Sequence, residues 1–145
     1  MTRRATIDRN RVREAVEAAE RHTSAEIVVS IAPFFIGSVE RAARRAFERL
    51  GIAHTRRRNG VLVFVVPARR QVMVIGDHGA EACVDSSVWC EVASQIAHAF
   101  ACGDGTAGLV AGVARLANAL SAPFPHKHDD VNELPDQPQR QGVPW

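Results

Sequence analysis

Two apolar runs separated by a short turn form the clearest hydrophobic pattern in this chain. Residues 61–66 are continuously apolar, residues 71–75 are nearly so, and the four residues between them include a proline. Short runs of Val, Ile, Leu and Phe that are bounded by Gly, Pro and Asn are typical of buried β-strands. The connection is long enough only for a turn, so the pattern predicts an antiparallel hairpin. Residues 76–79 follow it and are interpreted as a polar loop with a glycine at each end.

A strand and a helix are predicted before the hairpin. Residues 26–33 read EIVVSIAP, which is typical of a strand. Residues 39–50 carry apolar side chains at helical spacing, with Ser38 as a favourable N-cap and Gly51 at the end. Strand, helix and strand in this order form a βαβ unit, in which the two strands are parallel and the crossover is right-handed.

Helical spacing recurs in residues 7–22, from Asp85 to Gly103, and from Asp104 or Thr106 to Leu120. In the last segment Gly108 and Gly112 lie four residues apart, which indicates close approach to the sheet or to a neighbouring helix. The elements together predict an α/β fold: a three-layer α/β/α sandwich with a short mixed sheet and helices on both faces.

The length of the chain is that of one domain, which we expect over residues 1–120. Residues 121–145 are rich in Pro, Asp, Gln and Arg. Such a composition cannot bury enough apolar surface to form a core of its own. We therefore expect a C-terminal tail that is partly disordered or lies extended on the surface.

Composition narrows the classes of protein. No apolar run reaches the roughly 18 residues that a membrane span needs. The first twenty residues lack an apolar stretch of the kind found in secretory signals. We therefore expect a cytoplasmic protein without a membrane anchor. The three cysteines are irregularly spaced and form no CxxC pair, which favours plain thiols over a zinc or redox site.

Charge is unevenly distributed along the chain, although the net charge is only +2. Residues 1–70 contain fifteen Arg and seven acidic residues, whereas residues 71–145 contain three basic and nine acidic residues. A basic segment is found in many nucleic-acid-binding proteins. Here the arginines are spread over two predicted helices with almost no aromatic residues among them. We therefore expect a solvated surface and disfavour nucleic acid as a partner.

Strand direction brings three oxygen-bearing side chains to one edge of the predicted sheet. The first two strands start at this edge and the third ends there, so Glu26, Asn59 and Asp77 collect at it. Two carboxylates and an amide oxygen are hard ligands, which suit Ca²⁺ or Mg²⁺. The flanking loops add three side chains suited to contact a phosphate or another anion: His54, Arg58 and His78.

A purely local role for these residues is the alternative. Glu26 would then pair with a nearby arginine, Asn59 would form a turn, and Asp77 would cap a loop backbone. Residues 126–130 (HKHDD) contain metal-binding side chains, but a tail is a poorly preorganised site. Residues 103–108 are rich in glycine but lack the Lys-Ser/Thr pair of a phosphate-binding loop, so we interpret them as a turn between helices.

A set of short motifs resembles the TPM domain, the thylakoid-lumen-phosphatase-like family, in order and spacing over roughly residues 20–136. The matching segments are Ala25-Glu26-Ile27-Val28-Val29, Phe47 with Leu50-Gly51-Ile52, His54-Thr55 with Arg58-Asn59-Gly60-Val61-Leu62, Ile75-Gly76-Asp77-His78-Gly79, Trp89, Phe100 with Gly103-Asp104, Gly108-Leu109 with Gly112-Val113, Phe124-Pro125, and Asp130-Val131-Asn132-Glu133-Leu134-Pro135-Asp136. The last segment resembles the tail of a small cytoplasmic subgroup of the family.

The resemblance implies an α/β/α sandwich that binds a divalent cation through loops at one end of the sheet. Glu26, Asn59 and Asp77 take the corresponding positions in this chain. The resemblance also implies a phosphatase activity, which has been proposed for some members. The subgroup often has Gly before the first-strand Glu and a basic residue two positions after it, whereas this chain has Ala25 and Val28. The missing basic residue weakens an anion-binding role for the first strand.

We therefore predict a TPM-domain protein that binds Ca²⁺ or Mg²⁺ and serves as a binding or assembly module. Its acidic tail would dock a protein partner. The alternative is a metal-assisted phosphomonoesterase, in which Asp77 and Glu26 hold the metal and Arg58 binds phosphate. His54 or His78 would then act as the acid or base. This alternative ranks second because the sequence has no recognisable activated nucleophile.

Overall fold

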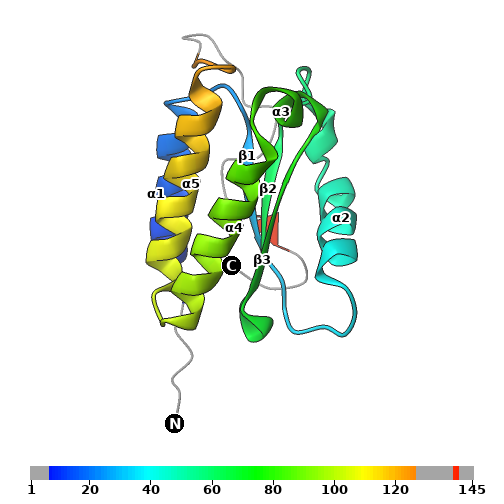
Figure 1. Cartoon of the computed structure of the whole chain (residues 1–145), viewed down its shortest axis with the longest axis vertical. Helices are drawn as coiled ribbons and strands as arrows, with labels where there is room; N and C mark the ends of the chain where they lie inside the picture. Colours follow the sequence, from blue (N-terminus) through cyan, green and yellow to red (C-terminus); the bar gives the residue numbers. More distant parts are fainter. Residues whose placement is uncertain (1–6, 127–138, 141–145) are drawn as a thin grey trace.

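A computed structural model of the chain describes residues 7–126 and the backbone of residues 139–140 (Figure 1). The helices are α1 (Arg9–Glu20), α2 (Val39–Arg49), α3 (His78–Cys83), α4 (Ser86–Ala101) and α5 (Gly105–Ser121). The strands are β1 (Ile27–Ile31), β2 (Val61–Val66), β3 (Gln71–Gly76) and β4 (Gln139–Arg140). Two short 3₁₀ helices are η1 (Ile52–His54) and η2 (Pro67–Arg69).

The described strands form a mixed sheet in the order β3-β2-β1-β4. β1 and β2 are parallel, with Ile27 opposite Val61, and β2 and β3 are antiparallel, with Val61 opposite Gly76. This arrangement confirms the predicted βαβ unit and hairpin, and η2 forms the hairpin turn. The two residues of β4 pair in parallel with β1. They belong to the predicted tail, of which residues 127–138 and 141–145 lie outside the described part.

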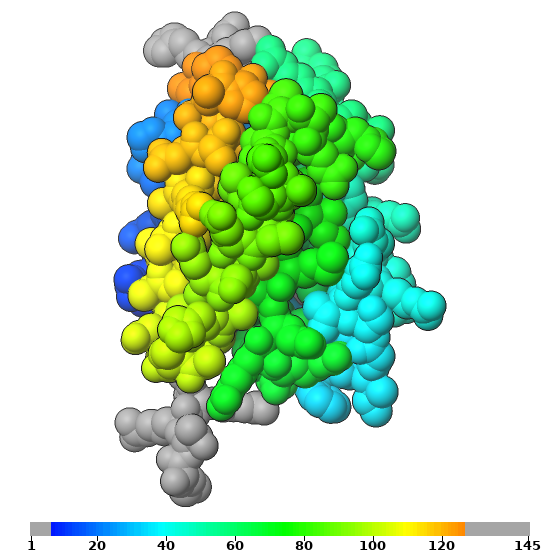
Figure 2. Space-filling model, viewed as in Figure 1, coloured from blue at the N-terminus to red at the C-terminus, as the bar shows by residue number. Residues whose placement is uncertain are grey.

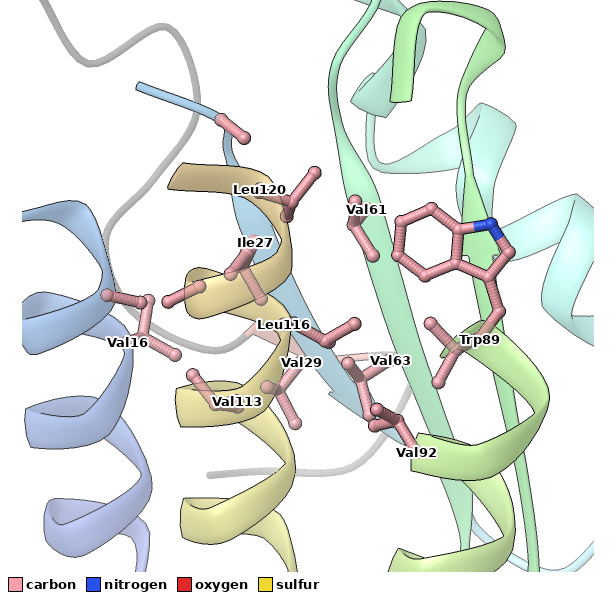
Figure 3. Packing of buried hydrophobic residues seen from close by; sticks show 14 of the residues in the cluster. Val16, Ile27, Val29, Val61, Val63, Trp89, Val92, Val113, Leu116 and Leu120 are labelled. Carbon is pink, nitrogen blue, oxygen red and sulfur yellow. The ribbon is translucent and has the colours of Figure 1, made fainter. Parts of the chain in front are cut away.

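Helices cover both faces of the sheet, which confirms the predicted three-layer sandwich. α1, α4 and α5 lie over one face and α2 lies over the other (Figure 1). In the larger core, Val113 and Leu116 of α5 lie close to Val29 and Val63 of the sheet (Figure 3). All residues of β2 are buried because this strand has a neighbour on each side and helices on both faces.

The prediction of a polar loop at residues 76–79 is wrong, because a short helix begins within this segment. Gly76 closes β3 and α3 begins at His78. The reason is Asp77, whose side chain accepts a hydrogen bond from the backbone N–H of His78 and so caps the helix. A helix of one to two turns is too short to show an apolar stripe in the sequence, so only its cap could have revealed it.

α4 and α5 approach each other closely along the glycines of α5. A Cβ added to Gly108 would lie 2.4 Å from the Cβ of Ala99, and one added to Gly112 would lie 2.6 Å from Cδ1 of Ile96. This confirms the close approach predicted from the glycine spacing and identifies a neighbouring helix as the contact. Within residues 7–126, none of the helices has the length and apolar character needed to cross a bilayer.

Candidate functional site at the strand ends

One row of residues across three strands forms the edge at which the sequence predicts a site. The register places Glu26 beside Gly60 and Gly60 beside Asp77. Two backbone hydrogen bonds fix the row. The N–H of Val61 donates to the carbonyl of Glu26 at 2.8 Å, and the N–H of Asp77 donates to the carbonyl of Gly60 at 2.9 Å. Because Asn59 directly precedes Gly60, the structure brings the backbones of all three predicted ligands to the same end of the sheet.

All three of these side chains are buried. The exposed fraction is 7% for Glu26 and 4% for both Asn59 and Asp77. Acidic and amide groups are costly to bury without hydrogen bonds, an opposite charge or an ion. Their burial therefore indicates a specific polar arrangement at this end of the sheet and not a solvated surface.

Asp77 is held by a charged side chain and by the backbone. Arg58 contacts both of its carboxylate oxygens, from Nε to Oδ2 at 2.6 Å and from Nη2 to Oδ1 at 3.0 Å. The N–H of His78 donates to Oδ1 at 2.8 Å. Burial by itself raises the pKa of Asp77, but the hydrogen bonds from Arg58 and His78 and the nearby positive charge lower it below its ordinary value. Asp77 is therefore a fixed negative charge at neutral pH.

Arg58 is fixed through its backbone, whereas its side chain lies partly in solvent. Its φ of 51° is in the left-handed region, and its carbonyl accepts hydrogen bonds from the N–H groups of Gly79 at 2.7 Å and Ala80 at 3.3 Å. The side chain is 46% exposed, while that of Asp77 is 4% exposed. The hydrogen bond with Asp77 raises the pKa of Arg58 against a smaller opposing effect of desolvation. The guanidinium thus covers Asp77 from the solvent side and has room to move away from it.

Two glycines allow neighbouring segments to reach the strand ends. A Cβ on Gly79 would lie 2.1 Å from the carbonyl oxygen of Arg57. A Cβ on Gly60 would lie 2.5 Å from Cγ2 of Ile52 and 2.6 Å from the carbonyl oxygen of the same residue. Neither distance is sterically allowed, so both positions require glycine for contact and not for an unusual backbone angle.

The two histidines predicted near the site are exposed at its rim. His54 ends η1 and His78 begins α3. Neither side chain is buried with the carboxylates. The backbone N–H of His78, and not its ring, makes the contact with Asp77. This contact is also the local capping role that the sequence left open as the alternative for Asp77.

Sequence reasoning missed how the segment before β2 is held. The N–H of Asn59 donates to Oγ1 of Thr55 at 3.1 Å, and Thr55 is 5% exposed. The spacing of four residues between them is a signal for such a side-chain turn, but it is also frequent by chance. The contact of Gly79 with the backbone before Asn59 has no signal in the sequence, because it depends on where α3 packs.

The arrangement offers hard oxygen ligands together with a cation that competes for one of them. Within the described residues, no three or more His, Cys, Asp or Glu side chains form a group that could hold a metal ion. Any metal site here therefore depends on the amide oxygen of Asn59 as a third ligand beside the two carboxylates. A groove of ≈ 340 Å³ lies elsewhere, between α2, β3 and α4, and none of the predicted site residues lines it.

The three cysteines lie on helices and not at the strand ends: one in α3, one in α4 and one at the end of α4. Cys83, Cys90 and Cys102 are all free and exposed. Sγ of Cys102 lies 3.6 Å from Nε2 of His98 in the last turn of α4. The spacing of four residues on a helix accounts for this contact. A thiol and an imidazole on an exposed helix end do not make a catalytic site by themselves.

Solved structures share the fold of this chain. The NMR structure of the BA42 protein from the psychrophilic bacterium Bizionia argentinensis matches it with a TM-score of 0.84 at 30% sequence identity, over 92% of each chain. The solution structure of the N-terminal domain of a P. gingivalis protein matches it with a TM-score of 0.69 at 20% identity, over 86% of this chain and 83% of that one. The second match supports the fold alone. A comparison with curated proteins found no match.

The chain is thus an α/β protein, a three-layer sandwich with buried acidic side chains at one edge of its sheet. The family model described as the TPM domain matches residues 5–119. The chain belongs to the TPM-domain family, as its motifs indicated.

Proposed function

We propose that this TPM-domain protein is a binding or assembly module whose strand edge binds Ca²⁺ or Mg²⁺ through Glu26, Asn59 and Asp77. The observation that carries the proposal is the burial of two carboxylates and an amide at one end of the sheet, where Asp77 is ionised at neutral pH. Oxygen ligands of this kind match the preference of both cations. The cytoplasmic location and a protein partner for the tail are further parts of the same proposal, and they rest on the sequence.

The ion pair of Asp77 sets the condition for such binding. Both of its oxygens contact Arg58, so the guanidinium has to leave before Asp77 can act as a ligand. The exposed position of the Arg58 side chain allows this. No proton has to be displaced, because the pKa of Asp77 is already low. The expected cation affinity is therefore weak and limited by competition with an arginine.

The proposal is tested by titrating CaCl₂ or MgCl₂ into the full chain and following backbone NMR signals. The first shifts should occur at Glu26, Asn59 and Asp77. Asp77→Asn should weaken binding by at least about tenfold, because a neutral amide replaces a carboxylate ligand. Arg58→Gln should strengthen binding severalfold, because it removes the competing cation.

Asp85→Asn is the matched control. Asp85 also caps a helix, accepting a hydrogen bond from the N–H of Ser87 at 2.9 Å, but the helix that it caps is α4 and its side chain is exposed. Its replacement should leave the titration unchanged. Uniform shifts along the chain, or equal affinities for the wild type and Asp77→Asn, would refute cation binding at this edge.

The phosphomonoesterase alternative makes the opposite prediction for Arg58. It is supported by a half-exposed guanidinium that contacts Asp77, the residue directly before the exposed His78. It ranks second because both donors of Arg58 described above are engaged with Asp77. Hydrolysis of a generic phosphomonoester that is lost on Arg58→Gln and on Asp77→Asn would favour it. Activity that survives both changes would come from elsewhere.

A further inference from the structure

The loop between β1 and α2 presents two large apolar side chains to solvent at the end of the molecule opposite the candidate site. Phe34 is 67% exposed and Ile36 is 92% exposed. Within residues 7–126, these two are the large apolar residues that lie exposed. Scattered single apolar residues are ordinary on protein surfaces, but two on one short loop form a local apolar tip.

The residue between them holds this loop in place. Phe35 points inward, where its ring centroid lies 6.5 Å from that of Phe64 in β2. The guanidinium carbon of Arg69 lies 5.2 Å from the centroid of the Phe35 ring. Nη1 of Arg69 also donates to the carbonyl of Gly37 at 2.6 Å and contacts that of Phe35 at 3.5 Å. Because both carbonyls that flank Ile36 are bound, the two apolar tips are kept facing outward.

Several arginines lie at the same end of the molecule as the tip. The β2–β3 turn, which carries Arg69 and the exposed Arg70, lies at the same end of the molecule as the loop (Figure 1). The first turns of α2 add Arg41 and Arg44, with Glu40 as the acidic neighbour, paired to Arg44 at 3.3 Å. Figure 2 shows α2 and the segment before it in cyan at the lower right, directly beside the green hairpin turn. This corner therefore combines projecting apolar groups with an excess of positive charge.

We propose that this corner docks on the surface of a membrane that contains anionic lipid, with Phe34 and Ile36 inserted at the boundary between headgroups and acyl chains. The charge complementarity is direct, since arginines around the tip meet acidic headgroups. Apolar side chains with a basic rim are the pattern of interfacial binding, and an aromatic ring is favoured at that depth. The binding is peripheral and reversible, and it is independent of the strand edge at the other end of the sheet.

The test is co-flotation of the full chain with two kinds of vesicle, in the presence of EDTA to exclude effects of divalent cations. One kind is phosphatidylcholine alone and the other is phosphatidylcholine and phosphatidylglycerol in equal parts. The chain should bind the anionic vesicles and not the neutral ones. The double variant Phe34→Ser with Ile36→Ser should lower the partition coefficient by at least about tenfold, since it removes the inserted apolar area. The separate double variant Phe34→Leu with Ile36→Leu keeps most of that apolar area and should therefore bind like the wild type.

Two variants that remove the same charge at different places separate attraction by the arginines near the tip from attraction by the overall positive charge. Arg41→Gln changes an arginine beside the tip, whereas Arg21→Gln makes the same change at the C-terminal end of α1. Only the first should weaken binding severalfold. The proposal is overturned if the serine double variant binds like the wild type, if both kinds of vesicle bind equally, or if the two arginine variants behave alike. It is also overturned if no vesicle binds and the loop instead mediates self-association, seen as a dimer in sedimentation that the serine variant abolishes.

Discussion

The contact between Arg58 and Asp77 determines which ligands either side chain is available to bind. Asp77 has the burial and charge of a metal ligand, but its oxygens are engaged by a guanidinium. Arg58 has the exposure of an anion-binding side chain, but its donors are engaged by the carboxylate. Each side chain therefore occupies the groups with which the other would bind a ligand. Cation binding and anion binding at this edge both require the same ion pair to open.

Gly79 is the residue whose replacement should damage this edge most directly. A Cβ there would lie 2.1 Å from a backbone carbonyl oxygen, so Gly79→Ala must displace α3 or the segment before β2. We expect a loss of about 1–3 kcal/mol in the free energy of unfolding, measured by urea denaturation.

Gly103→Ala is the comparison that separates this clash from backbone conformation. Gly103 has a φ of 85° and nothing within 4 Å of an added Cβ. Its replacement should cost about 1 kcal/mol through the left-handed backbone alone. If Gly79→Ala is no more destabilising than Gly103→Ala, the close contact described at Gly79 is incorrect.

At the scale of elements, the pairing of α4 with α5 depends on residues that lack side chains. An alanine usually stabilises a helix by about 1 kcal/mol relative to glycine. Gly112→Ala should do the opposite and lower the free energy of unfolding by about 1–3 kcal/mol, because the new Cβ would lie 2.6 Å from Ile96. Thermal or urea denaturation gives the sign directly.

A double-mutant cycle identifies the cause of this loss. The double variant with Gly112→Ala and Ile96→Val should lose less free energy of unfolding than the sum of the two single variants. The reason is that the shortened side chain of residue 96 makes room for the new methyl group. Additive effects would show that Gly112 does not rely on its contact with Ile96.

At the scale of the whole molecule, the buried sheet separates the two ends at which binding is proposed. The strand edge with Asp77 lies at one end, and the loop with Phe34 and Ile36 lies at the other. β2 connects them and is buried along its whole length. The two proposed binding functions can therefore be changed one at a time by substitutions that do not share contacts.

Acid unfolding of the whole molecule should report on the ion pair. The pKa of Asp77 is lowered in the folded state, so its contribution to stability is fully present above the ordinary value of about 3.9 and is lost as the pH falls through the folded-state value. Stability measured by urea denaturation between neutral pH and pH values below about 4 should therefore fall less steeply for Asp77→Asn than for the wild type. Arg58→Gln should raise the pKa of Asp77 and move the loss of stability to higher pH. Superimposable pH profiles for all three proteins would contradict this account.

Much of the fold could be predicted because its signals are local in the sequence. The runs at residues 61–66 and 71–75 and the helical stripe after Ser38 each specify an element by its own periodicity. Strand direction then follows from the length of each connection, which is why Glu26, Asn59 and Asp77 could be assigned to one edge. The errors lie at short elements such as α3, where a cap is the only signal.

The sequence by itself therefore determined the order of elements, their packing faces and the set of acidic and amide residues at one edge of the sheet. The tertiary structure alone decided what those residues contact. Arg58 reaches Asp77 because a left-handed residue and a closely packed glycine bring the two together, and neither feature follows from periodicity. Likewise, of three consecutive apolar residues, Phe35 is half-buried while Phe34 and Ile36 are exposed, because Arg69 and Phe64 are placed to contact only the middle side chain. Contacts between residues far apart in the chain depend on the relative placement of whole elements, which local patterns do not encode.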